Sequence, residues 1–139
     1  LRLQEKARSS DSRELSVNLS KCGGALGRRA YTADDFDLLV ACILDCKRLL
    51  GVFLIPTSVL VQHGFAGGKA LCMTLYPPWS PPKQKRTRAK YAWQPDFFLD
   101  LRGWQGGAQD LPMKSRDCLT HLLTVASKAA TQVLGEESQ

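Results

Sequence analysis

The strongest apolar pattern in the chain lies between residues 34 and 64 and predicts the core of the fold. Residues 36–43 form a near-continuous apolar run, and residues 51–55 form a second one after the polar turn at residues 45–48. Two short apolar runs joined by a polar turn predict neighbouring antiparallel strands. Their unbroken apolarity predicts a sheet that is covered on both faces.

A short helix is expected directly after the second run. Pro56 ends the strand, and Thr57 or Ser58 can cap a helix over residues 59–61. Gly64 can then end that helix.

The N-terminal part alternates in polarity. Residues 1–7 and 14–19 both alternate apolar and polar side chains, which predicts two half-buried strands that form a hairpin. Residues 21–29 are rich in glycine and carry basic side chains, which predicts a loop.

In the C-terminal half, a proline-rich segment separates two predicted strands, and a helix follows them. The apolar pattern of residues 70–76 predicts a strand. Residues 77–93 form a proline-rich basic loop, and residues 95–101 return to a strand-like pattern. Apolar side chains recur at helical spacing over residues 119–133 and predict a long helix that covers the sheet. We therefore expect one α/β domain over residues 1–139, with a mixed or antiparallel sheet flanked by a short helix and a long C-terminal helix.

Composition narrows the classes of function. The hydrophobic content is 44%, and no apolar run reaches the ~18 residues of a membrane span, so no membrane partner is expected. The net charge of +6 favours an anionic partner. Because the chain begins with Leu1 inside an alternating pattern, we expect it to be a fragment of a longer protein.

Cysteine usage indicates a reducing, intracellular compartment. The chain has an odd number of cysteines at irregular positions, and three lie inside apolar runs, so we expect reduced and buried thiols. Their spacing does not match a zinc site. The five cysteines are Cys22, Cys42, Cys46, Cys72 and Cys118.

The first candidate for chemistry is the pair Gln4 and Lys6 on the opening strand. Alternation places both side chains on one face, so an oxygen that can bind a metal and an ammonium that can position water lie together. This pair is a candidate for catalysis, although a polar residue two positions before a lysine is also common on exposed strands.

The segments around this pair resemble a known nuclease family. The strand LRLQEKAR, the later segment DDFDLLVACI and the segment LGVFLIPTSVLVQHG resemble the PD-(D/E)xK nuclease superfamily, in particular the small endonucleases associated with group I introns. The resemblance covers residues 1–64 and implies a restriction-endonuclease-like core, Mg²⁺ and phosphodiester hydrolysis. It assigns the (D/E)xK positions to Gln4 and Lys6.

One departure from the family changes the expected activity. The resemblance requires a metal-binding Asp on an earlier strand and a Glu on an earlier helix, and neither precedes Gln4 here. No complete metal site is therefore expected in this chain, and we expect it to be inactive alone, with Mg²⁺ bound only by a longer protein.

The second candidate is the basic part of the proline-rich loop. It contains five cations in residues 83–90 and has aromatic flanks, so it can neutralise phosphates and stack on bases. A nuclear import signal and a solvated loop are the alternatives. The candidate nucleic-acid-binding residues are Lys83, Lys85, Arg86, Arg88, Lys90, Trp79 and Trp93.

The third candidate is the acidic set Asp34, Asp35 and Asp37. These carboxylates could hold a metal, but at the start of an apolar strand a structural role is favoured, including ion pairs with Arg28 and Arg29.

Together these patterns predict the nucleic-acid-binding part of a PD-(D/E)xK-like endonuclease. The expected partner is DNA, duplex rather than single-stranded. The alternative is a non-catalytic module of the same fold that binds protein or DNA. A nuclear location and a dimeric state both stay open.

Overall fold

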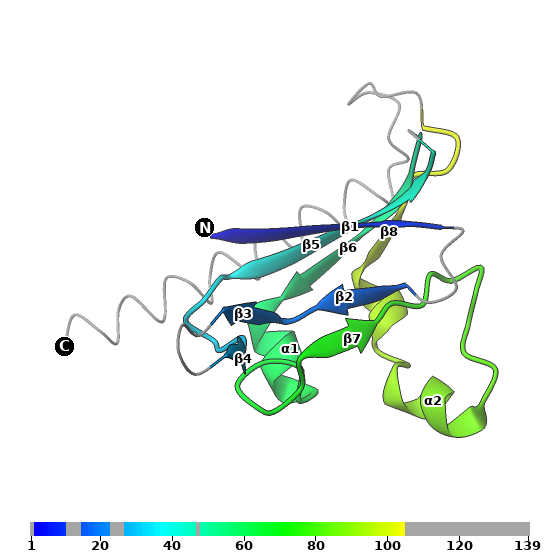
Figure 1. Ribbon diagram of the computed structural model, residues 1–139. Helices are drawn as coiled ribbons and strands as arrows, with labels where there is room; N and C mark the ends of the chain where they lie inside the picture. The colour runs from blue at the N-terminus through cyan, green and yellow to red at the C-terminus, as the bar shows by residue number, and fades with distance from the viewer. Residues whose placement is uncertain (1, 11–14, 23–26, 47, 105–139) are drawn as a thin grey trace.

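The fold is taken from a computed structural model, which describes residues 2–10, 15–22, 27–46 and 48–104 (Figure 1). Its centre is a four-stranded sheet in the order β1-β5-β6-β8. The strands are β1 (Leu3–Ser9), β5 (Leu38–Asp45), β6 (Arg48–Pro56) and β8 (Phe98–Asp100). β1 runs parallel to β5, whereas β6 is antiparallel to both β5 and β8. The predicted antiparallel pair is confirmed, and the sheet is mixed.

Both faces of β5 and β6 are apolar and largely buried, as the unbroken runs predicted, whereas most residues of β1 are exposed. The two apolar strands alternate, so that successive side chains enter two separate clusters on opposite faces. One cluster contains Phe36, Leu39, Ala41, Ile43, Phe53, Ile55 and Leu60, and the other contains Leu38, Val52, Leu54, Leu99 and Leu101.

Two smaller sheets lie beside the central one (Figure 1). β2 (Ser16–Asn18) pairs with β7 (Cys72–Thr74), and β3 (Ser20–Cys22) pairs with β4 (Arg28–Ala30), both antiparallel. The predicted hairpin between the first two strands is therefore wrong. Alternation identifies a half-buried strand but carries no information about its partner, and here β1 pairs with β5 instead. The two ends of the expected glycine-rich loop are likewise strands.

The short helix α1 (Thr57–Gln62) follows β6 directly, as predicted, but begins differently. No side chain caps its start, because the Thr57 hydroxyl instead donates to the carbonyl of Phe36 at 2.7 Å. Gly64 ends the helix with a φ of +82°, and the N–H of Phe65 donates to the carbonyl of Leu60 at 2.8 Å. This bond satisfies the carbonyl of Leu60, and the N–H of Gly64 donates to the carbonyl of Val61 at 3.2 Å. Only glycine adopts such a φ readily.

The expected basic loop is partly helical. Residues 77–84 have no regular structure, but α2 (Lys85–Lys90) follows, then the 3₁₀ helix η2 (Gln94–Phe97) and β8. Lys, Arg and Ala have high helix propensity, and the last proline of the run, Pro82, lies upstream of α2. The predicted long helix over residues 119–133 lies outside the described residues. Among the described residues, no helix is long and apolar enough to cross a membrane.

Candidate nucleic-acid interface

Gln4 and Lys6 lie on one face of β1. Both are half-buried, whereas Leu3, Glu5 and Ala7 between and beside them are exposed, as strand alternation requires. The ammonium of Lys6 donates to the hydroxyl of the buried Tyr31 at 3.4 Å and lies 5.6 Å from the centre of that ring. The fold therefore gives Lys6 a fixed partner on a neighbouring segment.

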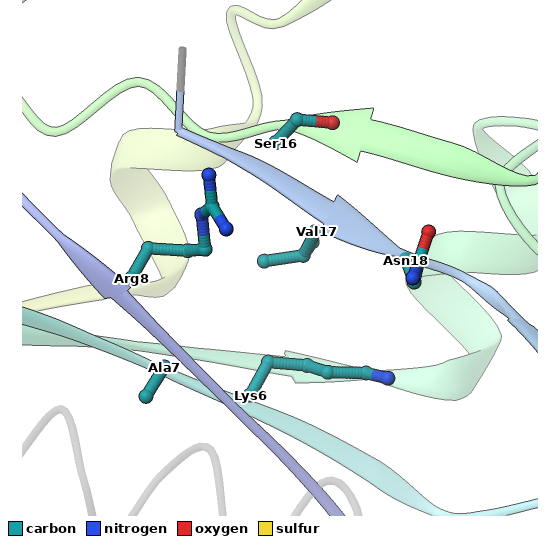
Figure 2. A pocket seen from close by; sticks show the side chains of 6 residues that line it. All are labelled: Lys6, Ala7, Arg8, Ser16, Val17 and Asn18. Atoms are coloured by element: carbon teal, nitrogen blue, oxygen red, sulfur yellow. The ribbon is translucent and has the colours of Figure 1, made fainter. Parts of the chain in front are cut away.

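Lys6 also lines a hollow between β1 and β2 with a volume of about 290 Å³ (Figure 2). Lys6 and Arg8 extend from β1 on the side of the hollow, and Ala7 points the other way. Ser16, Val17 and Asn18 contribute the β2 side. The sequence did not single out Arg8, Ser16 or Asn18, because only the packing of β2 opposite β1 brings them to Lys6.

Two members of the acidic set, Asp35 and Asp37, have the structural role that the sequence favoured. Asp35 forms ion pairs with Lys21 at 2.6 Å and Arg29 at 3.1 Å, and it accepts the backbone N–H of Thr32 at 2.7 Å. Burial raises the pKa of this carboxyl, but the hydrogen bonds from Arg29, Lys21 and Thr32 outweigh burial and hold the pKa far below 3.8. The expected partner Arg28 instead donates to Ser20 at 3.0 Å.

The neighbouring carboxylate of Asp37 is held in a similar way. It accepts the backbone N–H of Arg2 at 2.6 Å and pairs with the guanidinium at 3.2 Å. Burial works to raise the pKa of Asp37, and the bonds from Arg2 lower it below its ordinary value. These contacts attach the start of β1 to the segment that enters β5.

The described residues do not bring metal ligands together. No group of three or more His, Cys, Asp or Glu side chains forms within them. Cys22, Cys46 and Cys72 are exposed and Cys42 is half-buried, so the expectation of buried thiols is wrong for the first three. They lie at strand ends or in a turn, where side chains face solvent; Cys118 lies outside the described residues.

The basic segment presents its charge to solvent. Lys83, Lys85, Arg86, Arg88 and Lys90 are all exposed, and none forms an ion pair with a described carboxylate. None of the six residues of α2 is buried, so the cations surround the helix. Five positive charges on one short segment, with no ion-pair partner among the described carboxylates, make a surface that suits a polyanion.

Aromatic contacts hold this helix against the domain. Trp93 stacks on His63 with a centroid distance of 4.5 Å and an interplanar angle of 6°, and its indole N–H donates to the carbonyl of Lys90 at 3.0 Å. Lys90 lies over the rings of Phe65 and Tyr91, at 5.7 and 5.4 Å. α2 is thus fixed at its C-terminal end.

The second tryptophan of the candidate set packs on β8. Trp79 meets Phe98 edge-on at 5.3 Å, and the guanidinium of Arg102 lies 4.4 Å from its ring centre. Both tryptophans are half-buried. Packing occupies part of each ring, and base stacking by the remaining surface stays a prediction.

Comparison with known proteins supports the fold. No protein-family model matches the chain, and no curated protein matches it. A solved structure titled "Crystal Structure of MepB" is similar, with a TM-score of 0.59, 21% sequence identity and coverage of 70% of each chain. At this identity the likeness concerns the arrangement of strands and helices.

Proposed function

We propose that this chain is the nucleic-acid-binding part of a PD-(D/E)xK-like endonuclease. The observation that carries the binding role is the basic segment of residues 83–90, whose five exposed cations make no ion pair with a described carboxylate. Exposed cations that pair with none of the described carboxylates can displace counterions from phosphates, which is the main source of affinity for duplex DNA.

The sheet supports the nuclease part of the proposal. The three segments on which the resemblance rests form β1, β5 and β6, which are adjacent strands of one sheet. The segment ending in Ile55 and Pro56 continues into α1, as the resemblance implies. The resemblance assigns the positions of the catalytic pair to Gln4 and Lys6, which lie on the first of these strands.

The described residues do not suffice for the Mg²⁺ that the resemblance implies. Gln4 offers one neutral oxygen, a weaker ligand for Mg²⁺ than a carboxylate. We therefore assign binding to this chain and propose that hydrolysis needs carboxylates supplied by a longer protein.

Substitution of the basic segment tests the binding role. Lys83, Lys85, Arg86, Arg88 and Lys90 would be replaced together by Gln, and affinity for a labelled duplex measured by fluorescence anisotropy over a range of salt concentrations. Each lost phosphate contact should lower the slope of log K against log salt by about 0.9. The melting temperature should change little, because all five side chains are exposed. An unchanged affinity and slope would exclude this segment as the DNA surface.

A non-catalytic module of the same fold is the second candidate. The neutral Gln4 at the position of an acidic ligand favours it, and the exposed segment of residues 83–90 could then bind an acidic protein or serve as a nuclear import signal. Under either function we expect the protein in an intracellular, reducing compartment. Either function is compatible with a monomer or a dimer. The chain should bind the labelled duplex under the first candidate and should not bind it under a purely protein-binding one.

A further inference from the structure

The imidazole of His63 is the outer ring of an aromatic stack beside the basic segment. It lies parallel to the indole of Trp93, so the stack covers one face of the imidazole. His63 is exposed, and within the described part of the chain no ring other than that of Trp93 contacts it. The second face of the imidazole is therefore open to a planar ligand.

Both rings of this stack are held in position by the fold. His63 follows α1 directly, and its backbone N–H still donates to a helical carbonyl at 3.1 Å. The indole of Trp93 donates to the carbonyl of Lys90, as described above. The same ring packs against Phe65 and Phe97, at centroid distances of 6.1 and 6.2 Å. Because the rings are already ordered, a ligand that stacks on His63 loses little affinity to ordering of the protein.

Positive charge lies next to this stack. The carbonyl that accepts the indole N–H belongs to Lys90, the last residue of α2, so the basic helix ends beside the rings. An exposed ring next to exposed cations is the combination that binds unpaired nucleotides, because the ring stacks on the base and the cations contact the backbone. Inside a duplex the neighbouring base pairs cover each base, so only a base outside the stack can reach the imidazole.

We propose that His63 stacks on an unpaired base of the bound nucleic acid, in a single-stranded extension of the duplex. The proposal rests on the proposed function, since it specifies the form of the same ligand. It also changes the residue that meets the base. The sequence assigned stacking to Trp93, but His63 covers one face of the indole, so Trp93 supports the ring that contacts the ligand.

The test uses two fluorescein-labelled duplexes that carry single-stranded extensions of equal length. One extension contains adenines and the other contains abasic sites, so both present the same number of phosphates. In anisotropy titrations the unmodified chain should bind the adenine form about fivefold more tightly, which is the lower end of the range for stacking of one base on an aromatic ring. His63→Ala should remove this preference and leave the affinity for the abasic form unchanged.

Two further variants separate stacking from other roles of this position. His63→Phe should keep the preference for adenine, because it keeps an aromatic ring. Gln62→Ala, at the adjacent exposed position, should change neither affinity. The fluorescence of 2-aminopurine, an adenine analogue that is quenched when it stacks, should fall when the unmodified chain binds an extension that contains it, and should fall less with His63→Ala.

The outcomes distinguish this inference from the proposed function. Equal affinities of the unmodified chain for the adenine and abasic forms would overturn the inference alone, while the cations of residues 83–90 still govern binding. An equal loss of both affinities in His63→Ala would also overturn it, because the residue would then act without regard to the base. Failure of the unmodified chain to bind either duplex would overturn the proposed function as well.

Discussion

At the scale of single residues, the acidic set shows how neighbouring charges decide a role. Asp35 lies within reach of Lys21 on β3 and Arg29 on β4, so one carboxylate links both strands of that small sheet to the segment before β5. This half-buried carboxylate has two cations and a backbone N–H as partners, so its oxygens are satisfied without a metal. The sequence anticipated the pair with Arg29, but Lys21 became a partner only through the pairing of β3 with β4.

Asp35→Asn should therefore destabilise the protein, in a manner that depends on pH. Removing the charge weakens hydrogen bonds to charged groups and should cost about 1.5–3 kcal/mol at neutral pH. Because the folded-state pKa lies below 3.8, the carboxylate stabilises the fold fully above that value and progressively less as the pH falls below it. Urea unfolding at several pH values should show the two proteins converging in strongly acidic solution. A difference in stability that does not depend on pH would contradict the ion-pair role.

At the scale of elements, the polarity pattern predicted those strands and helices whose formation depends on residues close together in the sequence. The adjacent apolar runs and the proline after them predicted β5, β6 and α1. The partner of β1 and the pairing of β2 with β7 could not be predicted in this way, because they depend on contacts between distant segments. The charge and nearby prolines of its segment predict a loop in place of α2, although Lys, Arg and Ala favour helix.

The pairing of β6 with β8 depends on a close approach at Gly51. A Cβ at this position would lie 2.2 Å from a ring carbon of Phe98 and 2.9 Å from the carbonyl of Leu99. Gly51→Ala should therefore destabilise the protein by about 1–3 kcal/mol or more, since overpacking forces strands apart. Gly68→Ala is the control, because its Cβ would meet only an ordinary contact at 3.5 Å. Denaturant midpoints that shift equally in the two variants would argue against this packing.

Gln94 connects η2 to the strand β7 and its continuation. Its side chain is fully buried, accepts the N–H of Tyr76 and donates to the carbonyl of Thr74, both at 2.8 Å. Gln94→Met has a similar length but leaves both backbone groups without this partner, which should cost about 1–3 kcal/mol for each group left unsatisfied. Gln84→Met, at an exposed position, should be nearly neutral. Chemical denaturation of both variants checks this, and a Gln94→Met protein as stable as the original would show that these two hydrogen bonds contribute little to stability.

At the scale of the whole molecule, the sequence located parts of the candidate site but not their assembly. It placed Gln4 and Lys6 on one face of a strand and identified the cations of residues 83–90. It could not indicate Arg8, Ser16 and Asn18 as neighbours of Lys6, because their proximity depends on β2 lying opposite β1. Trp79 and Trp93 were expected to bind nucleic acid. In the fold, Trp79 packs against Phe98 and Trp93 stacks on His63, so part of each ring is already in contact with the protein.

The last prediction concerns binding without cleavage. Mg²⁺-assisted hydrolysis of a phosphodiester needs an ion held by carboxylates, so that water is activated and the leaving oxygen is stabilised. Gln4 supplies one neutral oxygen, so the 139-residue chain should bind duplex DNA, with EDTA present or absent, and should leave supercoiled plasmid intact in Mg²⁺. A gel assay for nicking and an anisotropy titration in EDTA measure the two parts separately.

A longer chain that supplies the carboxylates should bind Mg²⁺ and nick the same plasmid. Lys6→Ala in that chain should abolish nicking. Its DNA affinity should fall by no more than the amount expected for the loss of one phosphate contact. Metal-dependent nicking by the 139-residue chain would show that the active site has been placed wrongly. A longer chain that binds Mg²⁺ and DNA but never cleaves would leave the non-catalytic module as the better account, because the neutral Gln4 would then be the residue that prevents hydrolysis. Gln4→Glu in that chain separates the two accounts, since it restores the acidic ligand of the (D/E)xK pair and should produce nicking only if the rest of the site is complete.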